Sequence, residues 1–249
     1  MYGTRLRALS ALSVVTITTA FVLVFFYAPN DADQGFVQKI FYLHVPMAIV
    51  ALCGFVFGGI MAIQHLRTHE RRYDVRSYVA IHLSLVLAVG VLITGSIWAK
   101  ASWGHWWVWD EPTLVSFLII FLLYACYQPL RFSIEDPEKQ ATYASVFAIV
   151  AGAFVPLNFL AVRLSQNLVH PRVLTTTGGN LPGPMRLTFV VALVGMVLLY
   201  VTLWKYEMTS KNTTWQLRQL RRRLLGDDVA PLPAGRSAAP RAATPARPT

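Results

Sequence analysis

Charged residues are scarce in this sequence: they make up 14% of its 249 residues, whereas hydrophobic residues make up 55%. Acidic residues are the scarcer kind, with 12 Asp and Glu against 22 Lys and Arg. A soluble domain normally carries charge on about a quarter of its residues, because charged side chains cover its surface. The composition therefore excludes an ordinary soluble domain and favours a protein that exposes apolar surface to lipid.

Cysteine is also rare, with only Cys53 and Cys126, each inside a long apolar block. No Cys-x-x-Cys-His is present, which excludes a c-type cytochrome, and we interpret the two thiols as packing residues. A nucleotide-binding loop, a Gly-x-Ser-x-Gly elbow and a His-Glu-x-x-His zinc motif are missing as well. The sequence gives no indication of a hydrolase.

Long apolar blocks are what the sequence has instead. A bilayer core about 30 Å thick requires roughly 20 apolar residues per helix. A segment in lipid must be helical, because its backbone groups find no other hydrogen-bond partners. Six blocks reach or approach this length, namely residues 9–28, 41–64, 78–98, 113–128, 142–162 and 185–206. The first resembles a secretory signal, but no small-x-small cleavage site follows it. The sequence predicts an all-α integral membrane protein with six transmembrane helices.

Basic residues are distributed unevenly around these six helices. An even number of helices places both termini on one side, and most of the 22 basic residues fall on that side. By the positive-inside rule, both termini are predicted to be cytoplasmic. Membrane topology thus accounts for the net charge of +10, and we expect no nucleic-acid partner.

The sequence after the sixth block divides into two parts. We assign residues 1–210 to the membrane domain. Residues 211–230 predict a basic, partly amphipathic cytoplasmic helix, of a kind that lies on anionic lipid. Residues 231–249 are mostly Pro, Ala and Arg. They cannot bury a core, so we predict that they are disordered.

Tryptophan is concentrated in one place, with five of the seven residues between positions 98 and 109. The densest part reads Trp-Gly-His-Trp-Trp-Val-Trp-Asp at 103–110, in the predicted outer loop 99–112. Aromatic belts anchor helix ends with single tryptophans, so four within seven residues exceed that need. Such a cluster forms a flat, polarizable shelf that suits a large planar apolar ligand.

Two histidines flank this shelf on the same predicted side of the membrane. His44 lies at the outer end of the second helix, where we place Pro46 in the first turn. His170 lies in the third outer loop, residues 163–184. Two neutral imidazoles facing each other across an aromatic shelf are suited to axial ligation of a haem iron.

Two other interpretations of these residues remain open. His44 and His170 are otherwise interfacial histidines beside an aromatic belt. A zinc or copper site would add His105 as a third ligand, but it leaves the tryptophans unexplained. His65 and His69 fall in a charged inner loop, and His82 lies near the cytoplasmic face, so we interpret these three as solvated or interfacial.

The charged residues of the outer loops suggest further roles. Asp110 and Glu111 precede Pro112, which we expect to open the fourth helix. They would complement its dipole, or orient a histidine or a basic group of a partner. Carboxylates repel haem propionates, so the candidate propionate anchors are the cations Lys100, Arg163 and Arg172, which otherwise contact lipid phosphate. Residues 163–170 predict a short surface helix.

The Trp-Gly-x-Trp-Trp-x-Trp-Asp motif, with a histidine on either side, resembles the haem-handling protein superfamily. Phe-Tyr-Leu-His-Val-Pro at 41–46 and Ser-Gln-Asn-Leu-Val-His-Pro at 165–171 look like the two histidine sites of its cytochrome c maturation protein C (CcmC) family. Six helices and the chain length fit that family too, and the resemblance covers residues 1 to about 206. It implies that His44 and His170 are axial ligands of the haem iron. The motif residues would form the haem platform and docking surface; they are Trp103, Gly104, Trp106, Trp107, Trp109 and Asp110.

One stretch departs from the family pattern. The family commonly continues Trp-Asp-Ala-Arg-Leu-Thr, whereas this sequence reads Trp-Asp-Glu-Pro-Thr-Leu at 109–114. The arginine is missing. Any ion pair that it makes with a propionate or with Asp110 must be lost or replaced, which leaves the propionate contacts open.

The resemblance also implies a function. Haem b would bind non-covalently at the periplasmic face of the bacterial inner (plasma) membrane and pass to the haem chaperone CcmE during c-type cytochrome biogenesis. The ABC transporter subunits CcmA and CcmB, with CcmD, would be further partners. Such a protein is a carrier rather than an enzyme, although an open shelf would favour covalent attachment of haem to the chaperone. The alternatives are a haem lyase of the same superfamily and a membrane subunit of a transporter.

Overall fold

The computed structural model describes residues 2–165, 169–170 and 181–225, and its regular structure there is helical. A single isolated bridge joins Asp31 to Gly35. The helices follow one another as α1 (Tyr2–Val22), a π-helical turn η1 (Leu23–Tyr27), a 3-10 helix η2 (Phe36–Ile40), α2 (Phe41–Thr68), α3 (Arg71–Trp103), α4 (Pro112–Ala125), α5 (Tyr127–Phe132), α6 (Pro137–Leu164) and α7 (Gly183–Leu225).

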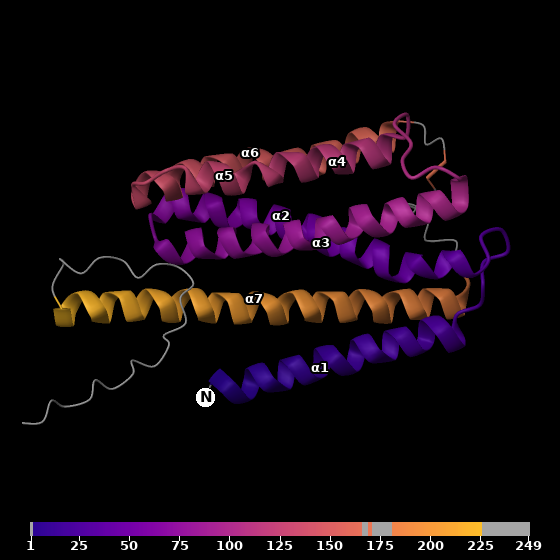
Figure 1. Ribbon diagram of the computed structural model, residues 1–249, viewed down its shortest axis with the longest axis horizontal. Coiled ribbons are helices and arrows are strands. Elements are labelled where there is room, and N and C mark those ends of the chain that lie inside the picture. The colour runs from indigo at the N-terminus through magenta and orange to yellow at the C-terminus, as the bar shows by residue number, and fades with distance from the viewer. Residues whose placement is uncertain (1, 166–168, 171–180, 226–249) are drawn as a thin grey trace, which may run out of the picture. The chain divides into compact units, whose positions relative to one another are not determined.

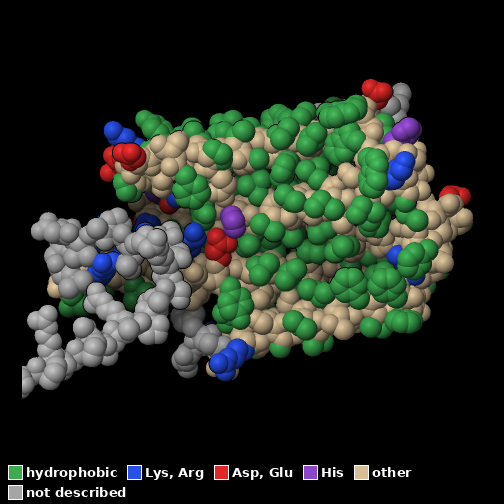
Figure 2. All heavy atoms as spheres, in the orientation of Figure 1, with side chains coloured by type: hydrophobic (Ala, Val, Ile, Leu, Met, Phe, Trp, Pro, Cys, Tyr) green, Lys and Arg blue, Asp and Glu red, His purple; other side chains and the backbone are tan. Residues whose placement is uncertain are grey.

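Within the described residues, six helical segments are long and apolar enough to cross a membrane. They are Thr4–Tyr27, Phe36–Thr68, Arg71–Trp103, Pro112–Phe132, Pro137–Leu164 and Gly183–Leu224. Figure 2 shows one face, on which hydrophobic side chains cover the middle of the helices and charged side chains lie toward their ends. The prediction of an all-α membrane protein with six spanning helices is therefore confirmed, while the cytoplasmic placement of the termini stays a prediction.

The helices extend beyond the apolar blocks that predicted them. The inner loop expected at 65–77 shrinks to His69 and Glu70, with His69 in the left-handed conformation at φ 56°. Helical hydrogen bonds continue through polar residues once the chain leaves lipid, so hydropathy marks the embedded part and not the helix ends. For the same reason α3 reaches Trp103, five residues into the predicted loop 99–112.

Two local predictions were wrong. Pro46 lies inside α2 and not in its first turn, because the helix begins at Phe41. The fourth span, Pro112–Phe132, contains the predicted block 113–128 and is divided into α4 and α5 at Cys126. Arg163 and Leu164 end α6, so no separate surface helix begins at 163. The remainder of that predicted helix falls largely outside the described residues.

The chain divides into two compact units, residues 1–211 and 212–249. In the second unit, the structure describes only the end of α7, through Leu225. Residues 226–249 lie outside the described residues, so the predicted disorder of 231–249 and the predicted cytoplasmic helix at 211–230 stay predictions.

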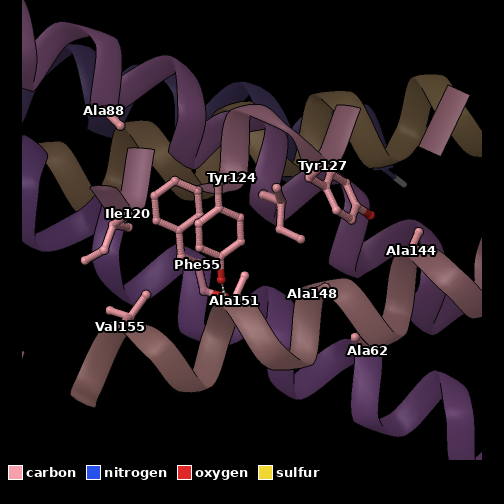
Figure 3. Close-up of a cluster of buried hydrophobic side chains, with 11 residues drawn as sticks. Phe55, Ala62, Ala88, Ile120, Tyr124, Tyr127, Ala144, Ala148, Ala151 and Val155 are labelled. Atoms are coloured by element: carbon pink, nitrogen blue, oxygen red, sulfur yellow. Dashed lines mark hydrogen bonds between the residues drawn. The ribbon is translucent and has the colours of Figure 1, made fainter. Parts of the chain in front are cut away.

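Small residues allow α2 and α6 to approach closely, side by side in Figure 1. A Cβ added at Gly59 would lie 3.1 Å from the Ala148 carbonyl oxygen and 3.3 Å from the Gly152 Cα. Close backbone approach through small residues is how helices associate in lipid, where apolar burial offers little advantage. The cluster around this contact includes Phe55 and Tyr124, whose rings lie against each other in Figure 3. The two rings are stacked, with centroids 3.8 Å apart.

Candidate functional site

A cavity at the end of the bundle where α2 begins and α3 ends contains both histidines of the predicted pair. Its walls come from α2, α3, α4 and α6, and they are mainly apolar. His44 and His170 both line it, although 126 positions separate them in the sequence. The structure thus brings together the two residues that sequence reasoning placed only on the same side.

Three residues of α3 hold the His44 ring. Trp98 meets it edge-on, with ring centroids 5.7 Å apart, and is itself fixed by an Nε1 hydrogen bond of 2.7 Å to Gln34. Gly95 leaves room for the ring, because a Cβ there would lie 2.9 Å from His44 Cε1. The Thr94 hydroxyl lies 3.0 Å from His44 Nδ1. These contacts define where the ring lies and which nitrogen, Nδ1, meets the Thr94 hydroxyl.

The hydrogen bonds around Thr94 also indicate the tautomer of His44. The Thr94 hydroxyl donates its only hydrogen along helix α3, with the Gly90 carbonyl oxygen 2.7 Å away. It therefore accepts from His44, whose proton is then on Nδ1. This leaves Nε2 as an unprotonated nitrogen that can bind a metal, since the partner of one ring nitrogen sets the state of the other.

The second histidine is positioned by the tryptophan loop, which we define as residues 104–111. The His170 ring meets Trp103 edge-on, with centroids 6.3 Å apart. The backbone N–H groups of Val169 and His170 donate to Glu111 Oε2 at 2.9 and 3.2 Å. Glu111 is fully buried and also caps α4, accepting from the Thr113 N–H at 3.5 Å. The Glu111 carboxylate therefore makes both kinds of contact that the sequence suggested: it caps a helix, and it binds the segment that carries a histidine.

The four motif tryptophans divide into two pairs. Trp103 and Trp107 line the cavity. Trp106 and Trp109 face outward and are 60% and 70% exposed. Gly104 separates Trp103 from the rest, since it ends α3 at φ 78°, a left-handed conformation that favours glycine. Only half of the predicted shelf therefore faces the cavity, and the other half is available to a partner or to the membrane interface.

The basic residues of the predicted outer loops differ in the contacts that they make. Lys39 Nζ is buried and donates to the carbonyls of Val24 and Ala28 at the end of η1. Lys100 Nζ donates to the Gly104 carbonyl oxygen. Arg163 lines the cavity, with its guanidinium 5.0 Å from the Phe159 ring centroid. Arg172 lies outside the described residues. Of the predicted propionate anchors, Arg163 is the one that the described structure places in the cavity wall.

Two further residues considered for the site lie away from the cavity wall, as Trp106 and Trp109 do. Asp110 and His105 are both exposed, and neither is among the residues that line the cavity. Within the described residues, which include all of His44, His105 and His170, no group of three His, Cys, Asp or Glu side chains could hold a metal ion. The three-histidine zinc or copper site therefore finds no support.

Sequence reasoning missed Thr94, Gly95 and Asn158, which lie in or beside the cavity wall. Thr94 and Gly95 sit in an uninterrupted apolar block, where small and hydroxyl residues are ordinary in membrane helices. No local signal distinguishes them. Glu111 did have a signal, because a carboxylate directly before a first-turn proline is a helix cap.

Comparison with known proteins gives a consistent result. The family model described as "Heme exporter protein C" matches residues 1–223. A heme exporter protein C of Rhodobacter capsulatus is 33% identical over 167 residues, which cover 67% of this chain and 69% of that protein. The Paracoccus denitrificans protein of the same name is 32% identical over 180 residues, or 72% and 74% of the two chains. The one from Escherichia coli K12 is 28% identical over 200 residues, or 80% of each chain.

Proposed function

Because the chain belongs to the heme exporter protein C family, we propose that its outer cavity binds haem between His44 and His170 and passes it to CcmE. Family membership supports a multi-pass membrane protein with a role in haem handling for cytochrome c biogenesis. The haem is the cargo of this protein, held as non-covalent haem b and then released. The protein would act as a carrier and not as an enzyme.

The observation that carries this proposal is the convergence of the two histidines on one apolar cavity. An apolar wall suits the porphyrin ring, and two neutral imidazoles suit the iron. Trp103 and Trp107 supply aromatic surface for the ring plane. Arg163 in the cavity wall would pair with a propionate. It would thereby replace the motif arginine that this sequence lacks.

The outward-facing half of the tryptophan motif supports the transfer step. Large exposed aromatics are typical of surfaces that bind another protein, and Trp106 and Trp109 lie next to the exposed Asp110. We propose that CcmE docks here, with CcmA, CcmB and CcmD as further partners. The site would face the periplasm across the bacterial inner membrane, since the basic inner loops point to the cytoplasm.

Haem titration of the detergent-purified protein tests the proposal. We expect a sharp Soret band of six-coordinate, two-histidine haem at a stoichiometry of one per chain. Addition of the soluble domain of CcmE should then move the haem to that domain, which can be separated and its spectrum recorded. A protein that gains no Soret band, or that retains its haem in the presence of CcmE, would contradict the carrier function.

Thr94→Val should weaken haem binding about tenfold, within the 10- to 100-fold range typical of losing the partner of a metal-bound histidine. Valine has nearly the shape of threonine but cannot accept from His44 Nδ1–H, so the ring loses its fixed tautomer and orientation. The measurement is the haem dissociation constant by absorbance titration. Thr94→Ser keeps the hydroxyl and should restore most of the affinity; equal weakening in both variants would assign the effect to packing.

A further inference from the structure

Glu111 has no role in the haem-binding proposal, yet it combines three structural features. It is fully buried, it belongs to the tryptophan loop, and it binds the backbone of the segment that carries His170. The segment is distant in sequence, 58 positions from Glu111. A buried carboxylate is stable only where strong hydrogen bonds replace its hydration. The two N–H donors of Val169 and His170 supply such bonds on one oxygen.

These hydrogen bonds position the backbone of His170. Hydrogen bonds to an ionised carboxylate are shorter and roughly twice as strong as neutral ones. The second oxygen of the same carboxylate faces the Thr113 N–H at the start of α4. The location of His170 relative to α4 is therefore set through the Glu111 side chain. Its ring then meets Trp103, which ends α3.

The same residue is also close to the exposed surface of the loop. Glu111 follows Trp109 by two positions, and Trp109 is 70% exposed while Glu111 is 0% exposed. Trp109 is in edge contact with Trp107, whose ring lines the cavity, with centroids 6.0 Å apart. A protein that docks on Trp106 and Trp109 therefore acts on a short loop that ends at the carboxylate holding His170.

We infer that Glu111 couples the tryptophan loop to the second axial histidine, so that docking of the acceptor protein loosens His170 and releases the haem. This inference rests on the proposed haem-carrier function. Glu111 is a positioning residue, since it acts through His170 and is not among the residues that line the cavity. His44 is held independently by α3, through Thr94, Gly95 and Trp98. Loss of the Glu111 bonds should therefore free one ligand and leave the other in place.

The first test uses the haem-loaded full-length protein in detergent. Glu111→Ala should convert the six-coordinate spectrum to a five-coordinate or mixed one and raise the rate of haem loss about 10- to 100-fold. Added imidazole should restore the six-coordinate spectrum, because the vacated position on the iron is open. Glu111→Gln retains an oxygen that can accept both N–H groups, so its spectrum should stay close to that of the wild type. Asp33→Asn removes an exposed outer carboxylate and should change nothing.

A double variant separates coupling from general damage. If Glu111 acts through His170, then Glu111→Ala in a His170→Ala background should change the rate of haem loss by less than about twofold, because shared effects do not add. The soluble domain of CcmE supplies the second readout. Its addition should accelerate haem loss from the wild type. In Glu111→Ala, the ratio of the rates of haem loss with and without CcmE should fall toward one.

The outcomes distinguish failure of the haem-carrier function from failure of the coupling role of Glu111. A wild-type protein without a haem spectrum overturns the carrier function and this inference together. A wild-type protein with two-histidine haem, but a Glu111→Ala variant with the same spectrum and rate, overturns this inference alone. The same holds if the effects of Glu111→Ala and His170→Ala simply multiply, or if CcmE accelerates haem loss from Glu111→Ala as much as from the wild type.

Discussion

Replacing His44 with alanine is expected to weaken haem binding by about a hundredfold or more, which corresponds to about 2.8 kcal/mol. The substitution removes a proposed iron ligand, whose ring lines the cavity and whose Nδ1 lies 3.0 Å from the Thr94 hydroxyl. His170→Ala should have a comparable effect, because the two rings line one cavity. The measurements are the haem content of the purified protein and the dissociation constant from absorbance titration. Free imidazole should partly restore the Soret band in both variants.

His105→Ala is the matched control for this experiment. His105 lies in the same tryptophan loop on the same side of the membrane, but it is exposed and outside the cavity wall. Its removal should change the haem dissociation constant by no more than about twofold from the wild-type value. A tenfold change would correspond to about 1.4 kcal/mol. If His105→Ala loses haem as strongly as His44→Ala, the assignment of the ligand pair is wrong.

The second large effect concerns stability at the other end of the helices. Arg131 and Asp74 form a two-pronged ion pair, with both N–O distances 2.7 Å and both side chains only 10% exposed. Tyr127 accepts from the same guanidinium, and Tyr78 lies beneath it. Asp74→Ala should lower the free energy of unfolding by about 3–5 kcal/mol, because it leaves the arginine charge buried without its partner. The measurement is denaturant or thermal unfolding in a defined detergent.

Two comparisons make this prediction specific. Glu70→Gln breaks the ion pair between Glu70 and Arg72, whose side chains are 45% and 58% exposed, and it should change stability by no more than about 1 kcal/mol. The double variant Asp74→Leu with Arg131→Met removes both buried charges and should recover much of the loss. A double variant less stable than Asp74→Ala would mean that the pair itself stabilises the fold.

Part of the candidate site could be predicted, because the prediction needed only the side of the membrane on which each residue lies. Helix parity places His44, His170 and the tryptophan motif on one side, and His44, His170, Trp103 and Trp107 line the cavity. Parity does not fix which way a ring points. The division of the tryptophans into cavity-lining and outward pairs depends on Gly104 ending α3 after Trp103.

The sequence by itself determined the number of membrane-spanning helices, because the transfer of apolar residues into lipid depends on local composition. It also determined the motif that led to the family. Only the tertiary structure decided that Glu111 binds the backbone of His170 and that Thr94 and Gly95 accommodate His44. These contacts join residues about 50 to 60 positions apart, and they exist only where helices and loops pack at particular distances. No local pattern encodes such a distance, so the sequence predicted the pair of histidines and did not predict the residues that hold them.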